Sequence, residues 1–128
     1  MYHWVLTTTV LAIHDEQLAE HGGREGIRDA NLLESALMRP QNLAEYAKPT
    51  VPELAAAYAL GILQSHPFFD GNKRTAAVVA ELFLDLNGMQ LHVNDAELVQ
   101  MIEGCAGGIV SAAEFTAFFN RCAVRASE

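Results

Sequence analysis

Apolar residues recur three or four positions apart along most of this chain, which is the spacing of one buried helix face. Residues 89–93 alternate between apolar and polar instead, as a short extended segment does. The helical repeats predict helices over residues 7–20, 29–40, 50–66 and 72–87. Because no linker-like stretch interrupts the pattern, we expect a single compact domain over residues 1–128.

Residues with capping side chains mark where several helices begin and end. We expect Asp29 to cap the second helix and Pro40 to stop it, because proline lacks the N–H that a continuing helix needs. Asn72 is a good N-cap residue for the helix over 72–87. Three further cap signatures are Thr50 with Glu53, Asn94 with Glu97, and Ser111 with Glu114. The last two add two helices, so the predicted fold is all-α with about six helices.

Small residues are concentrated in the two central helices. The helix over 54–66 and the first half of that over 72–87 are rich in alanine and glycine. Small side chains let two helix backbones approach closely, so we expect this pair to hold the junction at residues 66–72 in one geometry.

Composition and charge limit the classes of function that this chain can have. The net charge is −8, and only 8 Lys and Arg residues are scattered along the chain, which argues against nucleic-acid binding. There is no signal-like segment and no apolar run long enough to span a bilayer. Cys105 and Cys122 lie in apolar helical patterns without metal-ligand spacing, so we interpret them as reduced core residues. We therefore expect a cytoplasmic protein that binds neither DNA nor membranes.

The junction between the two central helices carries the candidate chemistry. His66 ends one helix, and an imidazole is suited to act as a general base near neutral pH. Asp70 is an oxygen ligand of the kind that Mg²⁺ uses together with substrate phosphates. Gly71 and Asn72 open the next helix, whose first N–H groups form an anion-binding nest.

Two cations complete this candidate site. Lys73 and Arg74 lie in the first helical turn, where the helix dipole disfavours cations unless an anion binds there as well. Arg74 can form two hydrogen bonds with a phosphate, and Lys73 acts as a point charge. Taken singly, such residues are more often structural: a histidine at a helix end, a plain turn, a solvated basic pair. Their occurrence together at one junction favours a nucleotide site.

The run His66-Pro67-Phe68-Phe69-Asp70-Gly71-Asn72-Lys73-Arg74 resembles the core motif of the Fic/Doc family. Further similarity to the death-on-curing (Doc) branch comes from His14-Asp15, His21 to Gly23, Gly26 to Asp29, Leu32 to Ala36, Arg39-Pro40 and Asn87-Gly88. The resemblance covers about residues 14–90 and implies a Fic-like helical domain. We expect His14, on an apolar helix face, to be a buried structural histidine, and Phe68 to anchor the motif loop in the core.

The resemblance also implies an activity. Family members that transfer AMP usually have a glycine where this chain has Lys73, and an arginine where it has Ala77. The two differences make the site similar to Doc toxins, which implies a kinase using ATP and Mg²⁺. Pro67 and Gly71 are closer to the AMP-transferring members, so an AMP transferase is the alternative. A binding module that keeps the pocket without catalysis is a third possibility, against which intact His66, Asp70 and Arg74 speak.

A Doc-like chain is expected to be the toxin of a toxin-antitoxin system. The resemblance implies phosphoryl transfer to a Ser/Thr hydroxyl of a translation elongation factor, which arrests translation and growth. It places residues 40–50, with Tyr46 and Lys48, in a flap that aligns the target peptide. The closest segment to the family's inhibitory helix, Ser35 to Arg39, lacks its glutamate. We therefore expect a separate antitoxin, whose C-terminal segment would bind an apolar groove made by residues 29–38 and 111–122.

Overall fold

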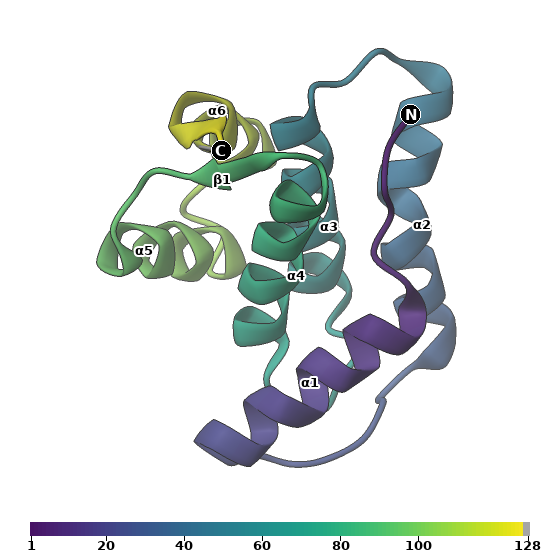
Figure 1. The fold of residues 1–128 in the computed structure, drawn as a ribbon. Helices are drawn as coiled ribbons and strands as arrows, with labels where there is room; N and C mark the ends of the chain where they lie inside the picture. Colours follow the sequence, from purple (N-terminus) through teal and green to yellow (C-terminus); the bar gives the residue numbers. More distant parts are fainter. Residues whose placement is uncertain (127–128) are drawn as a thin grey trace.

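Six helices and one small antiparallel sheet make up the computed structural model, which describes residues 1–126 (Figure 1). In chain order the elements are α1 (Thr7–His21), α2 (Ala30–Tyr46), α3 (Val51–Ser65), α4 (Asn72–Leu86), β1 (Met89–Leu91), α5 (Asp95–Ala106), α6 (Ala112–Cys122) and β2 (Ala123–Arg125). Strand β1 pairs with β2, with Leu91 opposite Ala123. The predicted all-α fold and its short extended segment are confirmed within the described part of the chain.

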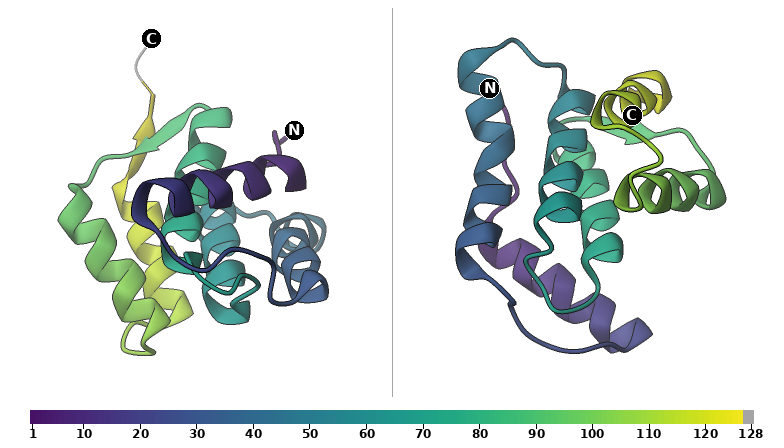
Figure 2. Two further views of the ribbon diagram at one scale, coloured as in Figure 1. Left: turned by 90° about the horizontal axis from the view of Figure 1, so that it is seen from below. Right: turned by 180° about the vertical axis from the view of Figure 1, so that it is seen from behind.

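Helix α3 is the centre of the molecule. Every residue from Leu54 to Leu63 is buried, so the helix has no polar face and needs partners all round. Helices α2, α4 and α6 pack against it. Figures 1 and 2 show α2 on one side of the α3–α4 pair, α5 and α6 on the other, and α1 across one end. The loop between α1 and α2 therefore meets the loop between α3 and α4 at that end.

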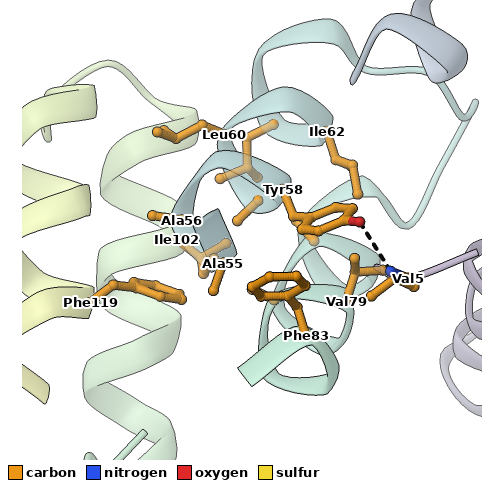
Figure 3. Close-up of a cluster of buried hydrophobic side chains, with 14 of the residues drawn as sticks. Val5, Ala55, Ala56, Tyr58, Leu60, Ile62, Val79, Phe83, Ile102 and Phe119 are labelled. Atoms are coloured by element: carbon orange, nitrogen blue, oxygen red, sulfur yellow. Dashed lines mark hydrogen bonds between the residues drawn. The ribbon is translucent and has the colours of Figure 1, made fainter. Parts of the chain in front are cut away.

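One buried hydrogen bond connects the N-terminal segment to the core. The hydroxyl of Tyr58, on α3, accepts the backbone N–H of Val5 at 3.0 Å (Figure 3). The Tyr58 ring packs against Phe83 of α4 with 5.2 Å between the ring centroids. Burial raises the pKa of the Tyr58 phenol, so the group stays neutral in the core.

Four of the five predicted capping side chains, those of Asp29, Thr50, Asn94 and Ser111, are confirmed. Asp29 accepts the N–H of Leu32 at 3.0 Å and caps α2. Full capping boxes, in which the third residue also reaches back, begin α3 at Thr50 and α6 at Ser111. Asn94 accepts the N–H of Glu97 at 2.8 Å at the start of α5. These interactions are local, which is why sequence spacing alone predicts them.

The prediction that Pro40 ends the second helix is wrong. Pro40 lies inside α2, which continues to Tyr46, and its ring is fully buried. Proline removes the N–H that would bind the carbonyl of Ala36, but burial of the ring against the core outweighs this loss. Helix α3 comes close to the main chain of α2 one turn before Pro40: a Cβ added to Gly61 would lie 2.8 Å from the Ala36 oxygen. Gly61 thus serves the contact with α2.

Two further expectations from the sequence concern the cysteines and membrane-spanning helices. Cys105 and Cys122 are free, half-buried and packed against the core. Burial raises the pKa of the Cys105 thiol, which keeps it protonated and unreactive. Among the described helices none is both long and apolar enough to cross a membrane.

We predict that Gly61→Ala destabilises the fold. The new methyl would meet the main chain of α2, and such overpacking costs about 1–3 kcal/mol, while the better helix propensity of alanine returns only about 1 kcal/mol. Urea denaturation should therefore show a lower free energy of unfolding. Gly104→Ala is the control, because its methyl would lie 2.6 Å from a side-chain methyl of Val110, which can turn away, and would not meet the main chain of another helix. An equal or greater loss in the control would contradict this account of the α2–α3 contact.

Candidate active site

His66 occupies the C-cap of α3 in a strained conformation. Its backbone has φ 49° and ψ 57°. Among the described residues it is the only one other than glycine with a positive φ. This left-handed geometry costs a side-chain-bearing residue roughly 1–2 kcal/mol. It turns the chain sharply out of the helix and leaves the imidazole exposed. Strain of this kind is common at functional sites, because the surroundings must hold it in place.

The loop after His66 is fastened to the core. Phe68 is buried, as predicted, and stacks on the His14 ring with 3.7 Å between centroids. The side chain of Asn72 accepts the N–H of Phe68 at 3.1 Å and donates to its carbonyl at 2.9 Å. The expectation that Asn72 caps α4 is therefore wrong: Gly71 is the N-cap, with φ 75°, and Asn72 is the first helical residue. The Asn72 side-chain amide makes two hydrogen bonds within the loop, whereas as an N-cap it would make only one.

The start of α4 presents backbone donors to this loop. The first hydrogen bond of the helix runs from the N–H of Thr75 to the carbonyl of Gly71, at 3.0 Å. The N–H groups of residues 72–74 precede that bond and have no carbonyl within the helix to bind. Together with the helix dipole, these groups provide the geometry of an anion-binding nest.

Asp70 is held beside the nest by several contacts. One carboxylate oxygen accepts the N–H of Arg24 at 3.0 Å, and the other accepts the N–H of Gly71 at 3.2 Å. The Arg24 bond above all, and then the Gly71 bond, hold the pKa of Asp70 below its usual range. Its main-chain carbonyl accepts the Nε2–H of His14 at 2.8 Å. His14 is buried, so its predicted structural role is confirmed.

The two cations have partners within the protein. Lys73 forms an exposed ion pair with Glu103 of α5, with 3.0 Å between nitrogen and oxygen. Arg74 donates from Nη2 to the carbonyl of Gly22, at the end of α1, at 3.2 Å. Its Nε is buried and has no partner among the described residues. A phosphate at the nest would therefore compete with Glu103 for Lys73.

A hollow of about 330 Å³ brings these groups together. It is lined by His66, Phe69, Asp70, Gly71, Asn72, Lys73, Arg74 and Glu103. All six residues predicted from the sequence thus lie around one cavity. A second hollow, of about 470 Å³, lies between α4 and α5 and shares Lys73, Arg74 and Glu103 with the first. The volumes are within the range of small-molecule sites.

The donor set fits one magnesium ion shared with a phosphate. Within residues 1–126, no group of three or more His, Cys, Asp or Glu side chains is placed to hold a metal ion. Asp70 is exposed and its low pKa keeps it ionised, and Mg²⁺ commonly takes one carboxylate together with substrate phosphates. The chemistry of these residues therefore fits Mg²⁺ held by Asp70 together with the phosphates of a bound nucleotide.

Sequence reasoning missed three residues that shape the site. Arg24 positions Asp70 and places its guanidinium 3.9 Å from the centre of the Phe69 ring. Arg28 binds the carbonyls of Ser65 and His66. Glu103 pairs with Lys73 from a separate helix. The similarity of residues 26–29 to the Doc branch was the available signal for Arg28, whereas Glu103 has no signal in the sequence.

The segment expected to form a flap is not beside this hollow. Residues 40–46 belong to α2, and the connection to Thr50 precedes the N-terminus of α3. His66 follows the other end of that helix, about 22 Å away at 1.5 Å per residue. Tyr46 is exposed, and Lys48 lines a different hollow. Neither residue is placed to align a peptide at the motif.

Comparison with known proteins agrees with this geometry. The model of the Fic/DOC family matches residues 4–84, which includes the motif and the loop that binds it. The chain is 35% identical over 103 residues to Protein kinase doc of Escherichia phage P1, covering 80% of this chain and 81% of that protein. It is 42% identical over 73 residues to Toxin Doc of Mycolicibacterium smegmatis, covering 55% of each. The chain belongs to the Fic/DOC family, in its Doc branch.

Proposed function

We propose that this protein transfers the γ-phosphoryl group of ATP to a Ser or Thr hydroxyl of a target protein, as the toxin of a toxin-antitoxin system. The observation that carries the proposal is the shared hollow of His66, Asp70 and the nest at the start of α4. A proton acceptor, a metal-ligating carboxylate and an anion site meet there, which is what phosphoryl transfer to a hydroxyl requires. Its relatives bear the names Protein kinase doc and Toxin Doc.

The roles follow from position. His66 takes the proton of the attacking hydroxyl, whose oxygen forms a bond with the γ-phosphorus while the bond to the departing ADP oxygen breaks. The N–H groups of residues 72–74 hold the transferred phosphate, with Gly71 providing the turn that exposes them. Lys73 and Arg74 bind further phosphate oxygens. Asp70 would hold Mg²⁺, which would neutralise phosphate charge when bound.

The side chain of Lys73 supports phosphoryl transfer over AMP transfer. Lys73 pairs with Glu103, and both residues line the hollow, so the lysine takes up room beside the nest that a glycine would leave open for a diphosphate. Ala77 lines the adjoining hollow and offers no cation for a second phosphate. Pro67 and Gly71, however, match the AMP-transferring members, and AMP transfer is therefore the alternative reaction at the same site.

A non-catalytic binding module is the rival from another class. It would need the nest and the cations but no base. His66 speaks against this reading, because an exposed imidazole lining the same hollow as the nest serves proton transfer and is not needed for binding alone.

The partners follow from the same proposal. The target is expected to be a translation elongation factor in the cytoplasm. A hollow of about 640 Å³ between α2, α3 and α6 suits an antitoxin segment, because alanines line much of its floor. It lies along the first two-thirds of α3, away from His66. The sequence predicted a groove made by residues 29–38 and 111–122. The hollow is lined by α6, as predicted, but by the second half of α2 in place of residues 29–38.

We predict that His66→Ala abolishes transfer while ATP binding persists. A general base typically contributes about 10²–10⁴-fold, and the nest does not involve the imidazole. Purified protein is incubated with a bacterial extract and ATP, and mass spectrometry then identifies the added mass as phosphate, AMP or nothing. His92→Ala, an exposed histidine outside the hollow, serves as the control. Transfer by His66→Ala at the wild-type rate would remove the base from the proposal, and no transfer by the wild type would favour the binding module.

We predict that Lys73→Gly weakens phosphoryl transfer roughly 10- to 100-fold, as expected for the loss of one charged hydrogen bond to phosphate. The same change opens space beside the nest, so the mass spectrum should now include AMP adducts. Glu103→Gln separates the two effects, because it breaks the ion pair but leaves the lysine in place. If the wild type already adds AMP and Lys73→Gly behaves identically, the kinase assignment is wrong.

We predict that expression of this chain alone arrests growth and that a small protein encoded beside it restores growth and co-purifies. Ala117→Glu places a charge in the 640 Å³ hollow and should prevent both rescue and co-purification without lowering transfer activity. Ala96→Glu, on the exposed start of α5, is the matched control. A harmless wild-type chain with an intact site would contradict the toxin proposal, and full rescue of Ala117→Glu would place the antitoxin elsewhere.

A further inference from the structure

The turn at His66 needs support from outside its own helix. The last carbonyl groups of a helix have no partner within it, and here the chain leaves α3 through a left-handed residue. The direction of the His66 side chain depends on the φ and ψ angles of that residue. These angles are set by the two peptide planes that flank its Cα: the plane with the Ser65 carbonyl and the plane with the His66 carbonyl.

Arg28 binds both planes. Its Nη2 donates to the Ser65 carbonyl at 2.8 Å, and its Nε donates to the His66 carbonyl at 2.7 Å. Its backbone N–H donates to the Pro67 carbonyl, also at 2.7 Å. One residue thus holds three consecutive carbonyl oxygens around the proposed base. The planar guanidinium can take two of them at once, which the single ammonium of a lysine cannot do in the same geometry.

Arg28 is itself anchored on both sides. The N–H of Asp29 also binds the Pro67 carbonyl, at 3.1 Å, and Asp29 caps α2. On the other side, the N–H of Phe69 binds the Gly26 carbonyl at 3.2 Å, and Ile27 forms a β-bridge with Phe68. The guanidinium therefore reaches the end of α3 from a segment whose backbone is already paired with the motif loop.

We propose that Arg28 is a positioning residue, which fixes the backbone of His66 so that the imidazole stays at the mouth of the nucleotide hollow. The inference rests on the proposed role of His66 as the base. None of the hydrogen bonds of Arg28 found in the described chain reaches Asp70 or the first turn of α4. Loss of its side chain should therefore reduce the rate of the chemical step and leave nucleotide binding intact.

The test compares Arg28→Ala, Arg28→Lys and a control, Arg39→Ala. Arg39 also extends from α2 to the end of α3, but it binds the side chain of Gln64, at 2.6 Å, and no carbonyl of the turn. Transfer of label from [γ-³²P]ATP and, in parallel, [α-³²P]ATP to proteins of a bacterial extract gives kcat and the KM for ATP. A misplaced group can cost about 10²-fold, so kcat of Arg28→Ala should fall by that order. KM should stay unchanged, Arg28→Lys should recover part of the rate, and Arg39→Ala should match the wild type.

A second measurement does not depend on activity. In protein with ¹³C-labelled histidine, the His66 ring signal, assigned by its loss in His66→Ala, should shift and broaden in Arg28→Ala. The His14 signal should not move, because that ring is buried against Phe68 and reports an intact fold. An unchanged His66 signal, or simultaneous loss of the His14 signal, would overturn the positioning role. If the wild type transfers no label at all, the proposed reaction fails, and the NMR comparison still decides what Arg28 does.

Discussion

The burial of α3 on every side is the constraint on which the rest of this structure depends. A helix with an uninterrupted buried run must be covered by α2, α4 and α6, and it can leave the core only at its ends. Its C-terminal end is where His66 turns outward and where the chain doubles back into α4. The proposed active site is therefore attached directly to the most extensively buried helix of the fold, and rigid scaffold elements hold groups in a fixed geometry better than loops do.

The positive charges at the site have oxygen partners close by within the protein. The chain carries a net charge of −8, yet Lys73 and Arg74 lie at a helix N-terminus, where the dipole opposes positive charge. In the absence of ligand each has an oxygen partner: the carboxylate of Glu103 for Lys73 and the carbonyl of Gly22 for Arg74. These two acceptors bind the cations but do not bind the N–H groups of the nest. A phosphate would thus exchange weak, exposed partners for the stronger contacts of a doubly charged group.

Predictions from the sequence succeeded where interactions are local and failed where distant parts of the chain meet. The capping boxes at Thr50 and Ser111 involve residues three positions apart, so spacing was sufficient. The prediction that Pro40 stops a helix failed because the burial of its ring depends on other helices, and a local sequence pattern does not report such contacts. The motif residues were found together because one short segment carries them. The partners of that segment, Arg28 and Glu103, lie 38 and 30 positions away in the chain, and no periodicity relates them to it.

The pairing of residues 26–29 with the motif loop has a consequence for how this chain can vary in length. Surface loops normally accept insertions, but here the backbone of the loop is a structural partner of the turn at His66, so an added residue would shift the register of every bond it makes. The turn after α5 is different: the N–H groups of residues 107–110 bind only carbonyls of α5 itself, and Ile109 is exposed. Grafted peptides, fluorescent labels or natural expansions of the family scaffold belong at that second turn.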